Sequence, residues 1–194
     1  MRSDTITVCT DGTGVSEALA QTEAVAVFKG LNRKDSLRLR LLAEEMMGML
    51  SALTGEVEAK FYIEDENNDF RLHLSTDTSM NSEKREKLLE VSTSGRNSSA
   101  VGVMGKLRNL FERAFEPVDS DPGNYLSVGW MDPEYDPLGV TAWSLCKYRD
   151  SIEKDGSAKE EWDELERSIV ANIADEIRIG IKGAKVEMII YKKF

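Results

Sequence analysis

The longest hydrophobic pattern in the chain covers residues 37–54 and predicts an amphipathic helix. Its apolar residues recur at the spacing that places them along one side of a helix. Asp35 or Ser36 is expected to cap the first turn, and Gly55 stands where such a helix ends. A helix of this length, about 27 Å at 1.5 Å per residue, needs a sheet or other helices over its apolar stripe. The stripe comprises Leu39, Leu42, Ala43, Met46, Met49, Leu50 and Leu53.

Five short segments alternate apolar and polar residues and are expected to be strands of one sheet. Such alternation is typical of a sheet with one covered and one exposed face. The apolar residues of all five strands should therefore point to the same face. His73, the only histidine, is expected on the solvent-exposed face with Arg71, where a lone histidine favours no catalytic triad. The segments are residues 5–10, 57–63, 70–74, 177–181 and 186–190.

Helical periodicity predicts further helices at residues 16–29, 82–91, 101–114, 140–154 and 158–174. Their order favours an α+β fold, a two-layer α/β sandwich with helices on one face of a mixed, mainly antiparallel sheet. All four prolines lie within residues 117–137, and a loop of that length inside a compact domain is uncommon. We therefore interpret the chain as a single domain with its core in residues 1–115 and 175–194. Residues 116–174 form a helical, Pro-rich insertion, whose large aromatic residues are either anchors for a partner or buried core: Trp130, Trp143 and Trp162.

Composition narrows the classes of partner. The net charge of −10 argues against a general nucleic-acid surface. No run of 18 apolar residues predicts a membrane span. Two cysteines, Cys9 and Cys146, provide no disulfide framework and no metal-ligand spacing, so a reducing cytoplasm is the expected location. The segment from Asp11 to Gly14 has turn chemistry but does not match a phosphate-binding loop.

The central helix also carries the first sign of a known family. Its sequence, LRLRLLAEEMMGMLSAL, resembles the nucleotide-site helix of the GHKL superfamily of ATPases and histidine kinases. The closest resemblance is to the anti-sigma-factor serine kinases, whose helix reads L-x-L-x-x-E-E-x-x-x-N-A. The second glutamate, the general base in that family, corresponds to Glu45. The magnesium-binding asparagine corresponds to Met49, which offers no oxygen to a hard cation. Sliding the match by one residue pairs Glu44 with Gly48, which serves no better.

Two further landmarks follow in the family's order. FRLHLSTDTSMN resembles the strand and D-x-G-x-G motif, with Asp77 as the adenine-binding aspartate and Ser79 at the first glycine position. SSAVGVMGKLRNLFE resembles the phosphate-binding turn, with Gly102 retained. The closing ADEIRIGIKGAKVEMIIYKKF resembles the family's final hairpin. Each of these residues also has a purely structural interpretation as an alternative to nucleotide binding. Glu45 is then part of a solvated helix flank, Asp77 is a turn aspartate, and Gly102 allows close helix packing.

The resemblance implies three functions. The first is a non-catalytic regulator that retains the histidine kinase-like ATPase fold and acts through protein contacts in bacterial signalling or transcription control. The second is an ATP-binding regulator similar to an anti-sigma factor, with ATP or ADP as cofactor. The third is an active serine kinase, which the residue at position 49 disfavours because phosphoryl transfer depends on metal and positioning. The family's partners, a sigma factor or an anti-anti-sigma-like regulator, are the expected protein partners, and no nucleic acid or membrane is expected.

Overall fold

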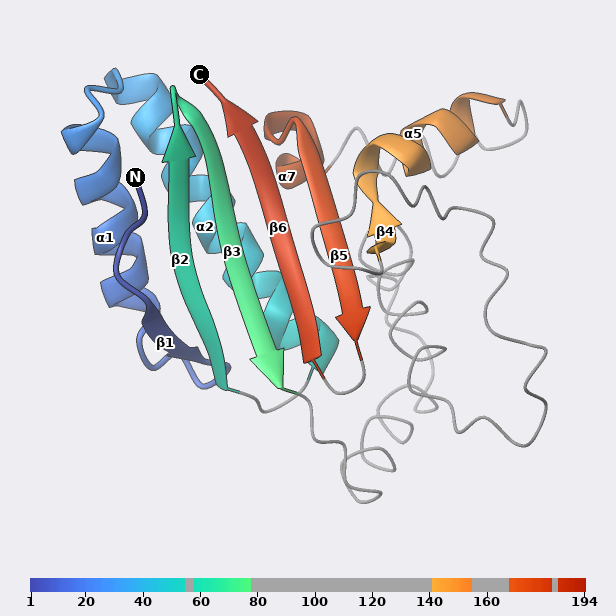
Figure 1. Cartoon of the computed structure of the whole chain (residues 1–194), viewed down its shortest axis with the longest axis horizontal. Helices are drawn as coiled ribbons and strands as arrows, with labels where there is room; N and C mark the ends of the chain where they lie inside the picture. Colours follow the sequence, from blue (N-terminus) through green and yellow to red (C-terminus); the bar gives the residue numbers. More distant parts are fainter. Residues whose placement is uncertain (55–57, 78–140, 155–167, 183–184) are drawn as a thin grey trace.

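The computed structural model describes residues 1–54, 58–77, 141–154, 168–182 and 185–194. Within these residues, six strands form one sheet in the order β1-β2-β3-β6-β5-β4, and every neighbouring pair is antiparallel. Helices α1, α2 and α7 lie behind the sheet in the view of Figure 1. The strands are β1 (Ile6–Cys9), β2 (Glu58–Glu66), β3 (Asp69–Asp77), β4 (Thr141–Ser144), β5 (Glu176–Lys182) and β6 (Lys185–Lys193). The helices are α1 (Val15–Phe28), α2 (Arg33–Thr54), α5 (Leu145–Lys154) and α7 (Ile169–Ile173).

The α+β class and the five expected strands are confirmed, since all five belong to this sheet. Their alternating apolar residues meet the helices in one buried cluster. One residue departs from the expected one-sided pattern. Ile189 is only 3% exposed although it pairs with His73 on β3 and Arg178 on β5, on the face away from the helices. The fully buried side chains that β2, β3, β5 and β6 contribute to the cluster include Phe61, Ile63, Phe70, Leu72, Ile177, Ile179 and Ile190.

Helix α2 buries the predicted stripe but begins earlier than predicted. Leu39, Leu42, Ala43 and Met46 are completely buried and Met49 is 3% exposed, whereas the side chains of Leu50 and Leu53 lie outside the described residues. The helix packs against α1, α7 and the sheet. A helix with such a stripe gains most of its stability from this packing rather than from intrinsic propensity.

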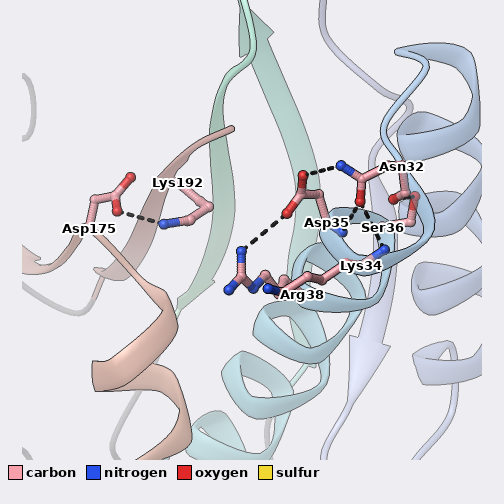
Figure 2. A network of polar contacts seen from close by, with 7 residues as sticks. All are labelled: Asn32, Lys34, Asp35, Ser36, Arg38, Asp175 and Lys192. Carbon is pink, nitrogen blue, oxygen red and sulfur yellow. Dashed lines mark hydrogen bonds and ion pairs between the residues drawn. The ribbon is translucent and has the colours of Figure 1, made fainter.

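The cap of α2 is Asn32, so the expectation of Asp35 or Ser36 is wrong. The side-chain oxygen of Asn32 accepts hydrogen bonds from the backbone N–H groups of Lys34 and Asp35, both at 3.0 Å. The side-chain amide of Asn32 donates to the Asp35 carboxylate at 2.6 Å (Figure 2). The physical reason is the short connection between the helices. Gly30, with φ of 68°, ends α1 in a left-handed conformation, and α2 starts as soon as the next capping side chain is available.

The described parts of the expected insertion belong to the main sheet and core. Residues 141–144, predicted as helix, form β4, which pairs with β5. Helix α5 then begins at Leu145, which is completely buried in the common cluster. Ile152 of α5 and Val170 of α7 join the same cluster, so residues 141–154 and 169–173 do not form a separate subregion. The expected helices at 82–91 and 101–114, the loop at 117–137, most of the helix at 158–174, and the side chains of Trp130, Trp143 and Trp162 lie outside the described residues.

Candidate functional site

The residues expected to bind nucleotide are only partly within the described structure. Glu45 lies in the second half of α2 and its side chain is partly exposed. Asp77 is the last residue of β3, where its backbone pairs with Lys185 of β6. The ends of α2 and β3 lie at the same end of the sheet (Figure 1). The side chain of Asp77, together with Ser79 and Gly102, lies outside the described residues.

Position 49, where the resemblance leads us to expect a magnesium-binding asparagine, belongs to the hydrophobic core. Met49 is 3% exposed and is part of the same buried cluster as Met46 and Leu42. Glu44 is exposed on the opposite side of the helix, and Glu45 lies at the boundary. The helix therefore presents a thioether to the core at the position where the resemblance leads us to expect an oxygen ligand.

The turn between β1 and α1 is closed by its own hydrogen bonds. The carboxylate of Asp11 accepts from the Thr13 N–H at 2.8 Å, and the Gly12 N–H donates to the Cys9 carbonyl at 3.0 Å. The hydrogen bonds from Thr13 lower the pKa of Asp11 below its usual value. Two of the turn's N–H groups are thus committed within the turn, and a carboxylate occupies its centre.

The most developed polar cluster lies on the open face of the sheet around His73. The imidazole of His73 on β3 stacks on the ring of Tyr62 on β2, with centroids 4.5 Å apart and planes 6° from parallel. The guanidinium of Arg2 lies over the ring of Tyr62, 3.9 Å from the centroid of that ring. Carboxylate oxygens of Glu64 on β2 and Glu187 on β6 lie 3.4 Å from Nε2 and 3.5 Å from Nδ1 of His73. The cluster joins three adjacent strands through one imidazole.

His73 is buried, so the expectation of a solvent-exposed histidine is wrong. The residue is 7% exposed even though it lies on the face away from the core. The alternation of the strand gives the correct face, but it carries no information about the neighbours on that face. Tyr62 covers the ring from above, and the two carboxylates flank its edge. A long or aromatic side chain on an adjacent strand can bury a residue that the pattern alone assigns to solvent.

The electrostatics of this cluster follow from its mixture of burial and charge. The adjacent imidazole of His73 and the nearby ammonium of Lys185 hold the pKa of Glu187 below its usual value, against an opposing effect of burial. Burial, Glu187 and Glu64 raise the pKa of Tyr62, so its hydroxyl keeps its proton. The cluster thus places two carboxylates and one imidazole side by side across β2, β3 and β6.

Glu187 is expected to contribute stability that acid removes. Its pKa in the folded protein lies below the ordinary 4.5, so the contribution is complete above about pH 4.5 and is lost as the pH falls through the folded-state pKa. Glu187→Gln should therefore lose less unfolding free energy on acidification than the wild type, by about 1 kcal/mol or less because the carboxylate retains contact with water. Urea denaturation at neutral and acidic pH measures this difference. Glu58→Gln, at an exposed position of β2, is the control, and an equal acid loss in wild type and Glu187→Gln would contradict the assignment.

A second polar group surrounds the start of α5 and was missed by sequence reasoning. The Ser144 hydroxyl accepts from the Lys147 N–H at 3.3 Å and donates to the Glu176 carboxylate at 3.0 Å. The other oxygen of Glu176 accepts from the Cys146 N–H at 3.2 Å. A carboxylate at a helix N-terminus is favourable because it satisfies free N–H groups and the helix dipole. Glu176 thus joins β5 to the first turn of α5.

Neither cysteine has the environment of a nucleophile. Burial and the carboxylate of Glu176 raise the pKa of Cys146. Burial, Asp11 and Glu58 raise the pKa of Cys9. A raised pKa reduces the fraction of thiolate, which is the reactive form. Both thiols are free.

The remaining features of the described residues add no further chemistry. A cavity of about 320 Å³ lies where the N-terminal segment meets the β2–β3 hairpin, and its lining mixes two arginines with four acidic residues. Among the described residues, no group of three or more His, Cys, Asp or Glu side chains is arranged to hold a metal ion. Within the same residues, no helix combines the length and apolarity that crossing a membrane requires. The cavity is lined by Met1, Arg2, Glu64, Asp65, Glu66, Asp69 and Arg71.

Comparison of the chain with models of known protein families, with curated proteins and with solved structures finds no match.

Proposed function

We propose that the protein is a non-catalytic regulator with a degenerate histidine kinase-like ATPase fold that acts through protein contacts in bacterial signalling or transcription control. The observation that supports this proposal most is that Met49 of α2 is buried in the hydrophobic core of the protein. A hard cation such as magnesium needs oxygen ligands, and phosphoryl transfer needs the metal on the triphosphate. A core thioether at that position supports a fold retained without its catalytic metal.

The order of elements supports the same proposal. A long helix packs against the sheet, a β2–β3 hairpin follows it, and the closing β5–β6 hairpin lies directly beside β3. The resemblance implied a helix, strand and final hairpin in this sequence. The described sheet differs from the expected mixed sheet in being antiparallel at every pair.

Exposed apolar side chains support a role in protein contacts. Val27 and Phe28 are each 76% exposed at the end of α1, and Leu37 is 64% exposed near the start of α2. Exposed apolar patches of this kind mark interaction sites more often than solitary surface residues do. We propose that a regulator of the sigma-factor or anti-anti-sigma type is the partner class, by resemblance of the motifs.

A thermal-shift titration with ATP and with ADP, each with and without magnesium, tests the proposal. The expected result is an unchanged melting temperature, because a ligand raises it only by binding the folded state. Glu45→Gln and its exposed neighbour Glu44→Gln provide a matched pair, and both should behave as the wild type. A magnesium-dependent shift that Glu45→Gln abolishes and Glu44→Gln retains would overturn the proposal in favour of an ATP-binding anti-sigma-like regulator. Nucleotide turnover with the same dependence would favour the serine kinase.

A further inference from the structure

Helix α1 carries apolar residues on both its inner and its outer sides. Its inner side buries Ala18, Val25 and Ala26 in the common core. Its outer side carries Ala20, Ala24 and Phe28, which recur every four residues and are all exposed. Exposed Ser16, Glu17 and Glu23 share this side of the helix, so the outer side of α1 combines an apolar ridge with charged residues. It is less polar than a helix face that is only solvated.

The apolar surface extends from α1 onto the first turns of α2. An ion pair between Glu23 and Arg40 links the two helices, which pack against each other in antiparallel directions. One turn from this pair toward the loop, on each helix, are Val27 and Leu37, which are 76% and 64% exposed. Since residues three or four apart share a helix face, Val27 lies on the same side of α1 as Glu23, and Leu37 lies on the same side of α2 as Arg40. In Figure 1, α1 lies at the edge of the molecule opposite β4, and α2 runs from the end of α1 across the back of the sheet.

The two ends of this surface carry opposite charges. Glu17 is exposed in the first turn of α1. Arg33 and Lys34 are exposed in the first turn of α2, at the other end of the helical pair. Glu17, Arg33 and Lys34 make no side-chain ion pair with any described residue, in contrast to Arg38 and Arg40. Along the axis of α1, this surface is therefore acidic at one end, apolar in the middle and basic at the other end.

We propose that this surface binds a second copy of the same chain, with the two α1 helices antiparallel about a two-fold axis at Ala24. An antiparallel arrangement brings the acidic end of each copy against the basic end of the other, so the contact is self-complementary as a two-fold interface requires. The inference goes beyond the proposed function and does not depend on it.

The helix register places the axis. Because Glu23 pairs with Arg40 in antiparallel helices, Arg33 lies at the level of Gly30. Ala24 is then midway between Glu17 and the level of Arg33, about 10 Å from each at 1.5 Å per residue. Rotation about Ala24 places Ala20 of one copy opposite Phe28 of the other. A small residue at the axis lets the helices approach closely, and the large ring meets a small side chain on each side.

The expected interface is small. It involves one helix face and the adjoining tip of a second helix, so association should be weak and visible in a concentration series. The charges at its ends set the orientation more than they set the affinity. Reversing either charged end should weaken association roughly tenfold or more, because each dimer contains that contact twice.

Analytical ultracentrifugation of the full chain tests the proposal with two charge-reversed variants. Glu17→Lys and the double variant Arg33→Glu, Lys34→Glu should each remain monomeric at concentrations where the wild type dimerises. An equimolar mixture of the two variants should dimerise again, since each reversed end then meets its reversed counterpart and each native end meets a native one. All three positions are exposed, and circular dichroism confirms that the variants stay folded. Glu58→Lys, an exposed glutamate on β2, controls for the change in net charge and should dimerise as the wild type does.

Three outcomes would overturn the proposal. The first is a wild type that stays monomeric over the whole concentration series. The second is an equal effect of Glu17→Lys and Glu58→Lys, which would show that net charge and not this surface controls association. The third is a mixture of the two variants that stays monomeric, which would exclude the antiparallel pairing. None of these outcomes bears on nucleotide binding, so failure here is distinguishable from failure of the proposed function.

Discussion

Leu42→Ala is expected to lower the free energy of unfolding by about 2–5 kcal/mol. Leu42 is completely buried in the middle of the α2 stripe, between Leu39 and Met46. Truncation removes the transfer free energy of the lost carbons and leaves a cavity that the sheet beneath cannot fill without moving. Urea denaturation followed by circular dichroism measures the change, and the midpoint should shift to lower urea.

Leu37→Ala on the same helix is the matched control, because it is the same substitution at a position that is 64% exposed. Its effect should stay within about 0.5 kcal/mol, as for other surface substitutions. Equal losses in the two variants would contradict the assignment of the α2 stripe to the core. The control also has a bearing on self-association, so both variants are to be measured at a concentration where the chain is monomeric.

The strands and the long helix could be predicted from the sequence because periodicity reports which face of an element is covered. Leu39, Leu42 and Met46 repeat at helical spacing, and Phe61 and Ile63 alternate at strand spacing. The sequence determines the first residue of a helix less well than it determines the buried face. Asn32, Asp35 and Ser36 are all competent caps, and only the tight α1–α2 connection selects Asn32.

Strand β4 was missed because a four-residue strand is too short to carry a period. Its sequence, TAWS, is followed directly by α5, and its apolar residues fit the helical spacing of α5. The pattern therefore predicts one continuous helix. The boundary is set by tertiary contacts: β4 pairs with β5, and Ser144 and Glu176 together cap α5. A glutamate more than thirty positions away in the chain leaves no local signal at residue 144.

The cluster around His73 was accessible from the sequence through hairpin register. Asn67 and Asn68 both have positive φ, of 54° and 65°, as the two-residue turn that favours asparagine requires. Such a turn pairs Glu66 with Asp69, and counting away from the turn along both strands pairs Tyr62 with His73. The contribution of Glu187 depends on the β3–β6 pairing between distant segments, which no local pattern gives. For the expected nucleotide residues, burial of Met49 follows from the same stripe that predicts the helix.

The second large loss of unfolding free energy is expected for a substitution at Gly14, in the turn before α1. Gly14 has φ of 78° and precedes α1, and a Cβ placed on it would lie 2.0 Å from the carbonyl oxygen of Thr7 in β1. Gly14→Ala therefore combines the left-handed conformation of an L-residue, about 1–2 kcal/mol, with a clash against backbone that can be relieved only by moving β1. Such overpacking costs about 1–3 kcal/mol, so we expect a total loss of about 2–5 kcal/mol.

Gly30→Ala separates the two contributions. Gly30 also has a left-handed conformation, with φ of 68°, but a Cβ there would meet nothing within 4 Å. Its substitution should cost about 1–2 kcal/mol from the backbone conformation alone. The difference between the two variants, measured by urea denaturation under the same conditions, then reports the contact between the turn and β1. Because Thr7 pairs with Lys60 of β2, displacement of β1 would disturb the edge of the sheet, and equal losses in Gly14→Ala and Gly30→Ala would contradict this close approach.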